Sequence, residues 1–421
     1  MAQATEALGM AADSAGTPPV VVIGNGPVGM QVVHDLRRRL PDAPLVVFGD
    51  EPYEPYDRLR LSSWLAGELD WLELIRPIDK SSLPGVVQRI GYRVERVDPI
   101  EKTVTDSAGT TWAYSKLVLA TGSTAHVPNI PGIQLTGVYR FHNLDDAMAL
   151  LARRARSHHT IVVGGGLVGL EAARGMQRLG TRVTVVDNAD RLMPKYLDER
   201  GSAYLQYELG RLGIAVLLGS GVVRVIGRER VQGVLLRDGT ELPCDTLILA
   251  AGIRPNVRLA KEARLSYCKG VLVDERMRTS DADIYAVGDC AEYRAQVSGL
   301  VAPGLEQAAV AAANICGQTR TYDGSVATSK LKVVGIPVFS MGPMGVAAHR
   351  HYGRSYCFSD PEKGIYRKIL VHRHRLAGAI GIGDWEERTR LQKHIANRSW
   401  VMPWQVLRFV RHGRLWTQKS R

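Results

Sequence analysis

Paired cysteines are missing from this sequence of 421 residues. Its five cysteines are scattered, and none of them belongs to a CxxC or CxxxxC pair; they are Cys244, Cys268, Cys290, Cys316 and Cys357. This spacing argues against a zinc site, an iron–sulfur cluster and a redox-active dithiol, since each needs clustered thiolates. We therefore expect no metal site. Unpaired cysteines are typical of a reducing compartment, so we also expect a cytoplasmic protein.

Long apolar runs and a basic N-terminus are missing as well. No apolar stretch approaches the roughly 20 residues that a membrane-spanning helix needs, so we expect no transmembrane segment. The first 19 residues contain neither lysine nor arginine and are rich in small residues and proline. They therefore lack the basic start of a secretory signal. We expect residues 1–17 to form a disordered leader.

Acidic residues are scarce in the last part of the chain. Residues 363–421 hold 14 lysines and arginines against three acids, which accounts for eleven of the twelve net positive charges. The first 362 residues are almost neutral, which is unlike a uniformly basic nucleic-acid binder, so we expect no nucleic-acid partner. The basic end either meets an acidic partner or is a solvated, arginine-rich surface.

What the sequence does contain is a strand, a glycine-rich turn and a helix near its start. The apolar residues Val20–Ile23 predict a buried strand, and Gly24-x-Gly26-Pro27-x-Gly29 follows at once. In a dinucleotide-binding turn the first glycine allows the tight turn, the second lets the pyrophosphate approach the backbone, and the third lets helix and strand pack closely. The pyrophosphate then meets the N-terminus of the helix. The alternative is a glycine-rich turn that binds no ligand.

Polar residues after the second apolar strand, Leu45–Phe48, extend this hypothesis. An acid about 20 positions beyond the last glycine of such a motif holds the ribose hydroxyls, and Asp50 or Glu51 fits. Arg58 lies in a polar segment punctuated by prolines and is suited to meet a pyrophosphate with two parallel hydrogen bonds; the alternative is a surface loop. Val86–Arg96 and Thr103–Val104 predict strands of a small meander.

The same glycine pattern returns in the middle of the chain. Thr160–Val163 predicts a strand, Gly164-x-Gly166-x-x-Gly169 repeats the spacing, and Asp187 ends the next strand, 18 residues beyond the last glycine. A carboxylate there would accept hydrogen bonds from a ribose 2′-OH and repel a 2′-phosphate, which favours NADH over NADPH, although nearby Arg191 softens that preference. Two complete motifs imply either two dinucleotides or one dinucleotide and a duplicated scaffold.

The character of the chain changes after Thr319. Strands are predicted at Val333–Phe339, Tyr366–Val371 and Leu376–Ile382, and a helix at Glu386–Ala396, so we expect a compact sheet-plus-helix domain.

The tail Trp400–Trp416 holds three of the seven tryptophans. Trp404, Leu407 and Val410 recur at helical spacing, with arginines alongside. This pattern suits a partner-binding or membrane-surface helix. We favour the alternative, in which the tail packs on its own domain.

Taken together, these motifs resemble those of the two-dinucleotide flavoprotein reductases, a branch of the pyridine nucleotide-disulfide oxidoreductase superfamily. Besides the two glycine motifs, the resemblance is carried by Ala120-Thr121-Gly122, by residues 250–256 (AAGIRPN) and by residues 279–290, which end in Ala286-Val287-Gly288-Asp289-Cys290. It covers roughly residues 18–340. In that family the first motif binds FAD and the second binds NAD(P)H.

The resemblance implies an α/β fold with two Rossmann-like dinucleotide-binding domains and a C-terminal α+β domain. The FAD-binding domain would be discontinuous, with residues 18–125 and 245–320. The NAD(P)H-binding domain would lie between them, at residues 126–244. Residues 321–421 would form the C-terminal interface domain with its basic, tryptophan-rich tail.

Within the superfamily, the lack of cysteines before Cys244 argues against several subclasses. Disulfide reductases place a CxxxxC pair after the second strand, and peroxidase and oxidase relatives place one cysteine there, whereas no cysteine precedes Cys244. Residues 55–62 (PYDRLRLS) instead resemble the PYxRxxLS signature of reductases that serve rubredoxin, ferredoxin or a nitrite reductase module. The chain resembles in particular the FAD/NAD half of the NAD(P)H nitrite reductase large subunit.

Roles for single residues follow from the resemblance. We expect Asp289 to hydrogen-bond the ribityl chain of FAD and Glu171 to lie near the nicotinamide, with no side chain acting as an assured catalytic acid or base. The other cofactor-binding residues that it implies are Ala120, Thr121, Gly122, Gly252 and Gly288.

We therefore expect an FAD-dependent NAD(P)H oxidoreductase. Hydride would pass from NADH, or less readily from NADPH, to FAD, and electrons would pass on to a small iron–sulfur protein or another redox protein. One alternative is an enzyme that reduces oxygen or a quinone without a partner protein. Another is a non-enzymatic, flavin-bound redox sensor. A homodimer is one option for its assembly.

Overall fold

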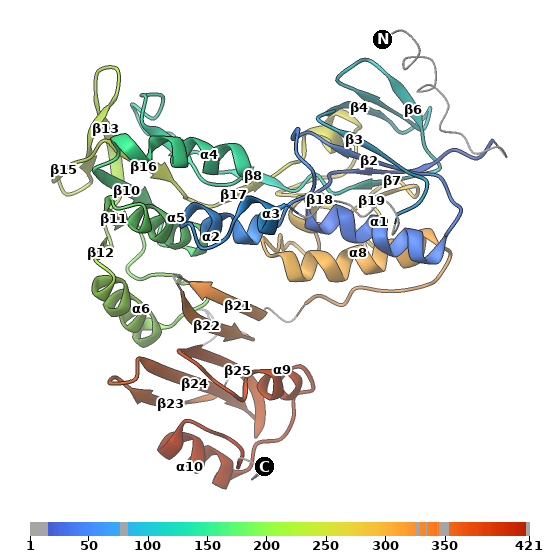
Figure 1. Ribbon diagram of the computed structural model, residues 1–421. Coiled ribbons are helices and arrows are strands. Elements are labelled where there is room, and N and C mark those ends of the chain that lie inside the picture. Colours follow the sequence, from blue (N-terminus) through green and yellow to red (C-terminus); the bar gives the residue numbers. More distant parts are fainter. Residues whose placement is uncertain are drawn as a thin grey trace. The chain divides into compact units, whose positions relative to one another are not determined.

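A computed structural model of the chain describes residues 16–75, 83–325, 328–333, 335–342, 344 and 353–417 (Figure 1). Of the expected leader, residues 1–15 lie outside the described residues. The chain divides into two compact units: Met1–Leu61, Leu69–Thr124 and Ile253–Ser325 form the first, and Ser62–Glu68, Ala125–Gly252 and Val326–Arg421 form the second. The domain limits expected from the sequence stay a prediction.

The first unit is built on a five-stranded parallel sheet in the order β19-β7-β1-β2-β3. Its strands are β1 (Val20–Ile23), β2 (Leu45–Gly49), β3 (Val86–Ile90), β7 (Lys116–Leu119) and β19 (Ile284–Ala286). Every residue of β1 and β2 is buried, as expected for short apolar runs in a parallel sheet that is covered on both faces. Because β19 comes from far along the sequence, this unit is discontinuous.

Two layers cover the faces of this sheet. Helices α1 (Pro27–Arg39) and α8 (Val301–Ile315) lie side by side (Figure 1) and pack with Val20 and Val22 of β1. Val21 and Ile23 point to the other face and pack with Trp112, whose strand belongs to a small antiparallel sheet. That sheet consists of β4 (Val94–Asp98), β5 (Thr103–Asp106) and β6 (Thr111–Ala113).

The predicted meander over Val86–Arg96 is wrong in its first half. Residues of β3 pair in parallel with β2 and extend the main sheet, whereas β4 belongs to the antiparallel sheet. Gly91, with φ +78°, separates the two strands. Periodicity alone does not reveal this change of sheet, because both segments are extended.

Short elements complete the first unit. They are α3 (Trp71–Leu74), α7 (Arg258–Glu262), β8 (Ser123–Ala125, which ends at the start of the second unit), β17 (Ile253–Pro255), β18 (Val271–Leu272), β20 (Ala291–Glu292) and the 3₁₀ turns Arg58–Arg60 and Gly288–Cys290.

The second unit repeats the parallel architecture, with a sheet in the order β12-β11-β10-β16-β9. Its strands are β9 (Val138–Arg140), β10 (His159–Val163), β11 (Arg182–Val186), β12 (Ile214–Leu217) and β16 (Thr246–Leu249). The helices of this part are α2 (Leu61–Leu65), α4 (Leu144–Arg153, continued by a 3₁₀ turn at Arg154–Arg156), α5 (Leu167–Arg178) and α6 (Glu199–Arg211). An antiparallel sheet of β13 (Val222–Gly227), β14 (Val231–Leu236) and β15 (Glu241–Pro243) adjoins them.

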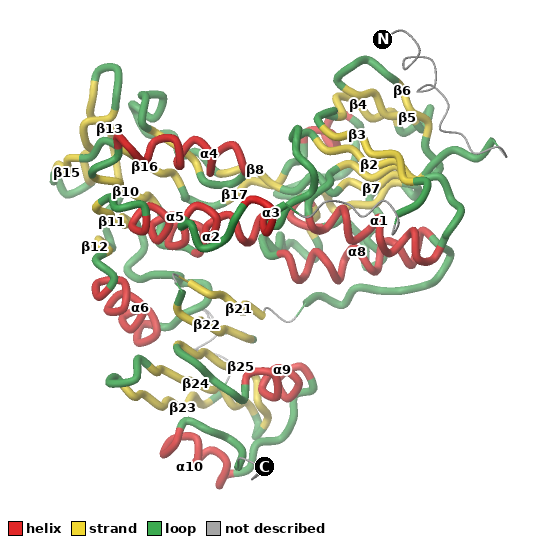
Figure 2. Tube along the Cα trace, viewed as in Figure 1, coloured by secondary structure: helices red, strands yellow, loops and turns green. Residues whose placement is uncertain are grey.

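The C-terminal part of the second unit is an antiparallel sheet in the order β21-β22-β25-β24-β23, with two helices (Figure 2). The strands are β21 (Thr328–Val333), β22 (Ile336–Met341), β23 (Arg354–Asp360), β24 (Ile365–His372) and β25 (Arg375–Ile382), and the helices are α9 (Arg388–Ala396) and α10 (Pro403–His412). The chain thus has the expected α/β fold with two Rossmann-like domains and a C-terminal α+β domain. Across its described part, no helix combines the length and apolar character that crossing a membrane requires.

Two details of this domain differ from the sequence-based prediction. The strand predicted at Val333–Phe339 crosses a turn, since Gly335 has φ +85° and separates β21 from β22. In the tail, α10 packs on its own domain as favoured, but through Phe409, which is fully buried. The predicted stripe of Trp404, Leu407 and Val410 is exposed instead.

A buried polar cluster joins the C-terminal sheet to α6. Asp198 caps α6 by accepting a hydrogen bond from the Gly201 N–H at 3.0 Å, and its other oxygen accepts bonds from the Tyr366 hydroxyl and the Lys368 ammonium, both at 2.8 Å. The Lys368 side chain is 7% exposed and that of Asp198 12%. Burial alone would raise the pKa of Asp198, but these hydrogen bonds hold it below its ordinary value.

Lys368→Met should lower the free energy of unfolding by about 3 kcal/mol, because removal of one partner leaves a buried carboxylate poorly compensated. Denaturant unfolding at neutral pH measures this loss. A difference within error of zero would show that the ion pair is not needed to hold the sheet to α6.

Acid stability tests the same cluster. The pKa of Asp198 is lower in the folded protein than in the unfolded chain. Its ionised carboxylate therefore adds to the free energy of unfolding above the ordinary aspartate pKa of about 4, and this contribution is lost as the pH falls through the pKa of the folded state. Asp198→Asn should therefore make stability less dependent on pH in this acidic range. Asp190→Asn is the matched control, since the Asp190 side chain is 79% exposed, and it should leave the pH dependence unchanged.

Candidate cofactor-binding sites

The first glycine motif forms the turn between β1 and α1. Gly26 is the N-cap of α1 in an extended conformation, Pro27 follows as the first helical residue, and no side chain caps the helix. The first turn contains no acidic residue either. Unpaired N–H groups therefore remain at this helix end, which is the arrangement that binds a pyrophosphate.

The three glycines have different surroundings. A Cβ at Gly24 would collide with the carbonyl of Ala120, and a Cβ at Gly29 with the carbonyl of Gly24. Near Gly26, by contrast, the nearest atom to such a Cβ is the Arg58 Nε at 4.0 Å. The first and third glycines thus serve close backbone packing, and the second leaves open space above the turn, as the pyrophosphate of a dinucleotide requires.

Arg58 is held beside this open space. Its guanidinium pairs with Glu51, which also accepts a hydrogen bond from the Tyr56 hydroxyl at 2.7 Å. The Glu51 side chain is 13% exposed. Asp50 is 57% exposed and has Arg93 at 3.7 Å. Of the two acids predicted for the ribose, Glu51 therefore positions Arg58, whereas Asp50 remains accessible to a ligand.

The predicted Ala120-Thr121-Gly122 segment follows β7 and is held by Asn256. The Asn256 amide donates to the Thr121 carbonyl at 2.7 Å, and its backbone N–H donates to the Gly122 carbonyl at 3.0 Å. The Thr121 hydroxyl donates in return to the Asn256 carbonyl at 3.1 Å. Asn256 is a positioning residue that the sequence did not reveal, because its partners lie more than 130 residues away.

Asp289 lies in the 3₁₀ turn that follows β19, and the Ser123 hydroxyl donates to its Oδ2 at 2.9 Å. Gly288 has φ +77°, and its N–H donates to Gln307 Oε1 of α8 at 2.8 Å. Gly304 of the same helix lets it approach, since a Cβ there would meet Val28 at 2.6 Å and Gly288 Cα at 3.2 Å. The turn of Asp289 is thus brought against the start of α1, in the same unit as the first motif.

The second motif has the same construction. Gly166 is the N-cap of α5 without a side-chain cap, and nothing lies within 4 Å of a Cβ built on it. A Cβ at Gly164 would collide with the carbonyl of Ala250, and a Cβ at Gly169 with that of Gly164. The residues therefore fit a second dinucleotide by the same criterion.

Asp187 stands beside this second turn. Its carboxylate accepts hydrogen bonds from the N–H groups of Gly165 and of Ala189, the latter at 2.8 Å. Arg191 is turned to other acids, with Asp190 at 3.3 Å and Glu199 at 3.7 Å. Pairing of Arg191 with these acids reduces its availability to a 2′-phosphate.

The last two predicted residues lie in the same unit as the second motif. Glu171 is half-buried in α5, directly after the helix start. Gly252 follows β16 with φ +107°, and nothing lies within 4 Å of a Cβ there. Its position after β16 matches that of Gly122 after β7 in the first unit.

All five cysteines are free, and Cys244 and Cys290 are buried. Burial raises the pKa of Cys244 to about 12 and also raises those of Cys290 and Cys316. Cys290, although adjacent to Asp289, is fully buried, and its thiol donates to the carbonyls of Leu119 and Val287 at 3.3 Å. A raised pKa disfavours the thiolate form, which a redox-active dithiol needs.

Comparison with known families agrees with this geometry. The family model described as pyridine nucleotide-disulphide oxidoreductase matches residues 18–314, and that of the rubredoxin NAD⁺ reductase C-terminal domain matches residues 328–399. The chain belongs to the pyridine nucleotide-disulphide oxidoreductase family. This confirms the predicted family, the cofactors FAD and NAD(P)H, and an oxidoreductase without a redox-active disulfide.

Individual relatives are similar over most of this chain. It is 36% identical over 379 residues to the NAD(P)H nitrite reductase of Bacillus subtilis, and the aligned region covers 89% of this chain and 47% of that protein. It is also 36% identical over 377 residues to the assimilatory nitrate reductase electron transfer subunit of the same organism, covering 88% and 48%. The chain therefore spans about half the length of these relatives. A crystal structure of a ferredoxin reductase from Rhodopseudomonas palustris matches with a TM-score of 0.84 at 26% identity, covering 93% of this chain and 97% of that one.

The open space at Gly26 and at Gly166, the second glycine of each motif, predicts that an alanine at each position affects a different cofactor. Gly26→Ala should leave the melting temperature of the FAD-free protein unchanged but weaken FAD binding by more than about tenfold, because the methyl group occupies the pyrophosphate position. Gly166→Ala should retain FAD and raise the KM for NADH by about tenfold. FAD titration and steady-state kinetics measure both effects, and a variant that altered the other cofactor instead would contradict the assignment of the two motifs.

Asp187→Ala should raise the KM for NADH about tenfold and that for NADPH less, since only the ribose of NADH offers the 2′-OH that this carboxylate would bind. Initial rates with both cofactors and ferricyanide as acceptor give the ratio. Asp238→Ala, in the turn between β14 and β15, is the control and should leave both KM values unchanged. An unchanged NADH/NADPH ratio in Asp187→Ala would rule out this role of Asp187.

Proposed function

We propose that this protein takes a hydride from NADH onto FAD and passes the electrons to a separate small redox protein. The observation that carries the proposal is the presence of two open dinucleotide turns in a chain whose five cysteines are all free. Each turn presents an uncapped helix end and an open second glycine. Since none of the five cysteines is paired, electrons arriving at a flavin have no dithiol in this chain to go to.

The relatives support the same proposal. One is named an electron transfer subunit of nitrate reductase, another a nitrite reductase, and a solved structure of similar fold is a ferredoxin reductase. Each of these names denotes a reductase or a subunit that hands electrons on. We carry this general role to the present chain, with a small iron–sulfur protein as the acceptor.

The residues of the first unit would hold FAD. When bound, FAD accepts a hydride from a nicotinamide and gives up electrons one at a time. The N–H groups at the start of α1 and the guanidinium of Arg58 would bind its pyrophosphate, and Glu51 would keep Arg58 in place. Asp50 would bind the adenosine ribose. Asp289, oriented by Ser123, would accept a hydrogen bond from the ribityl chain.

The residues of the second unit would hold NADH. The N–H groups at the start of α5 would bind its pyrophosphate and Asp187 its ribose, with Gly252 leaving room for the cofactor beyond β16. Glu171 would lie near the nicotinamide. Orientation of the reacting rings is the main contribution of the protein in this proposal, because hydride transfer between two cofactors needs no acid or base from a side chain.

We infer a cytoplasmic setting from the same free cysteines, since an oxidising compartment favours disulfides. A homodimer stays a prediction. The preference for NADH over NADPH rests on Asp187 and on the pairing of Arg191 described above.

The decisive measurement is steady-state NADH oxidation with and without an added acceptor protein. With rubredoxin or a [2Fe–2S] ferredoxin present, cytochrome c should be reduced quickly, and without it slowly. Equal NADH oxidation with oxygen alone would identify a reductase of small acceptors instead. Absence of flavin bleaching by NADH under anaerobic conditions would rule out both enzymes and leave a flavin-bound sensor.

A further inference from the structure

The tail helix α10 exposes an unusually apolar face. Its side chains Trp404, Leu407 and Val410 are 62%, 63% and 46% exposed, and the preceding Trp400 and Met402 are 56% and 41% exposed. We name these five residues the apolar stripe. Tryptophan and methionine are rare on free surfaces and enriched in protein interfaces, so the stripe needs an explanation beyond chance exposure.

The stripe is exposed although the helix itself is firmly held. Phe409 on its opposite side is fully buried and stacks on Trp385 with ring centroids 6.0 Å apart. After the helix, the Glu387 carboxylate accepts the N–H groups of Leu415 and Trp416 at 3.0 and 2.9 Å, and Arg367 donates to the Gly413 carbonyl at 2.9 Å. The domain core therefore fixes α10 in an orientation that keeps the apolar stripe in solvent.

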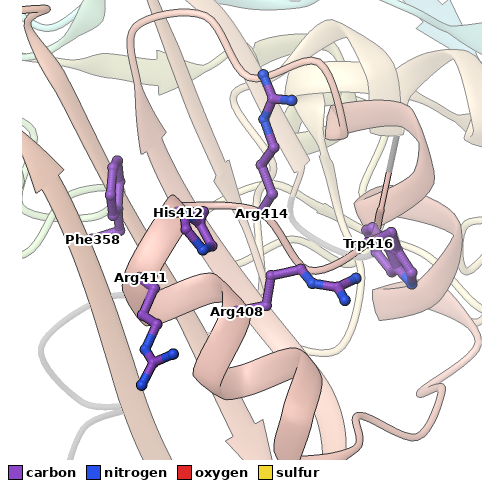
Figure 3. Close-up of a pocket in the computed structure, with 6 residues that line it drawn as sticks. All are labelled: Phe358, Arg408, Arg411, His412, Arg414 and Trp416. Carbon is purple, nitrogen blue, oxygen red and sulfur yellow. The ribbon is translucent and has the colours of Figure 1, made fainter. Parts of the chain in front are cut away.

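A basic pocket lies on the same helix, next to the stripe. It has a volume of about 510 Å³ and is lined by Phe358, Arg408, Arg411, His412, Arg414 and Trp416 (Figure 3). Arg414 has Glu386 at 3.4 Å, whereas Arg408 and Arg411 form no ion pair with any described residue. Two guanidinium groups beside an apolar surface are thus left for an anionic partner.

The directions of the arginines indicate what kind of anion fits. Figure 3 shows Arg408 extending toward Trp416, while Arg411 and Arg414 point to opposite sides of the pocket. Their guanidinium groups do not converge on one point, as chelation of a single phosphate requires. They suit several carboxylates spread over a surface.

We propose that the apolar stripe and the basic pocket together form the docking surface for an acidic protein. The combination of tryptophan, methionine and arginine is typical of the residues that dominate protein–protein binding energy. Apart from His412, the four basic residues between 398 and 417 are all arginines, which pair with carboxylates in two-bond geometry. Residues 398–417 contain no acid, and the neighbouring Glu386 lies beside Arg414 and not beside Arg408 or Arg411 in the ion pairs of the described residues. This inference rests on the proposed function, in that the acidic protein is the electron acceptor.

The first test is a charge reversal, Arg408→Glu with Arg411→Glu. The matched control, Arg224→Glu with Arg228→Glu, makes the same charge change at two exposed arginines that belong to or follow β13. The probes are an acidic rubredoxin and an acidic [2Fe–2S] ferredoxin. At low salt, the KM for whichever acceptor the wild-type protein reduces should rise at least about tenfold in the α10 variant and change little in the control. NADH-dependent ferricyanide reduction should stay unchanged in both variants.

The second test removes the apolar contacts, with Trp404→Ser and Leu407→Ser together. Both side chains are exposed, so the melting temperature should not fall, and the KM for the same acceptor should again rise about tenfold. Unlike the charge reversal, this effect should persist at high salt, because burial of apolar surface is not screened.

The outcomes separate the two proposals. If wild type reduces the iron–sulfur protein and both α10 variants keep its KM, the docking surface is overturned and the proposed function stands. If wild type reduces ferricyanide but neither protein acceptor, both are overturned. Saturable binding of pyrophosphate, or of phosphatidylserine vesicles, that the charge reversal abolishes without changing the acceptor KM would assign the surface to a small anion or to a membrane and would also overturn the docking proposal.

Discussion

Close approach of the backbone at four glycines is the constraint on which both nucleotide sites depend. At Gly24 and Gly164 the chain leaving the sheet passes directly against the carbonyl of the alanine that follows a neighbouring strand. At Gly29 and Gly169 the helix packs against the turn that precedes it. A single methyl group at any of these positions would collide with a carbonyl oxygen. The helix end is therefore pressed against the sheet, and the glycine between each pair, Gly26 or Gly166, is left facing open space.

The acids around these turns hold protein groups in place as well as facing the ligand positions. Glu51 keeps Arg58 beside Gly26, and Asp187 ties down the N–H groups of Gly165 and Ala189. Hydrogen bonds to an ionised carboxylate are stronger than neutral ones, so Asp187 fixes its turn, and Glu51 fixes Arg58, before any cofactor binds. Such an arrangement reduces the ordering that binding would otherwise have to supply.

The parts of this structure that follow from local sequence pattern are predictable from the sequence. The buried strands Val20–Ile23 and Thr160–Val163 and the glycine turns predicted two nucleotide-binding units, and the resemblance of the whole set of motifs to a known family implied the fold and the cofactors. What the sequence could not predict depends on contacts between distant segments. Asn256 holds Thr121 across more than a hundred residues. Gln307 is one of three polar residues in an alanine-rich helix, and its partner, Gly288, is known only from the fold. In the tail, the helical spacing predicted the helix but not the face that it buries. Phe409 is buried in place of Trp404 because Phe409 stacks on the Trp385 ring, a contact that only the folded domain provides.

The cluster around Asp198 has a consequence for exchanging parts between members of this family. One carboxylate caps a helix of the nucleotide-binding domain while it pairs with a lysine and accepts a hydrogen bond from a tyrosine, both from the C-terminal sheet. A chimaera that joins this nucleotide-binding domain to a foreign C-terminal domain lacking equivalents of Tyr366 and Lys368 would enclose an uncompensated negative charge at the seam. A chimaera of this kind should therefore keep residues 198, 366 and 368 from the same parent protein.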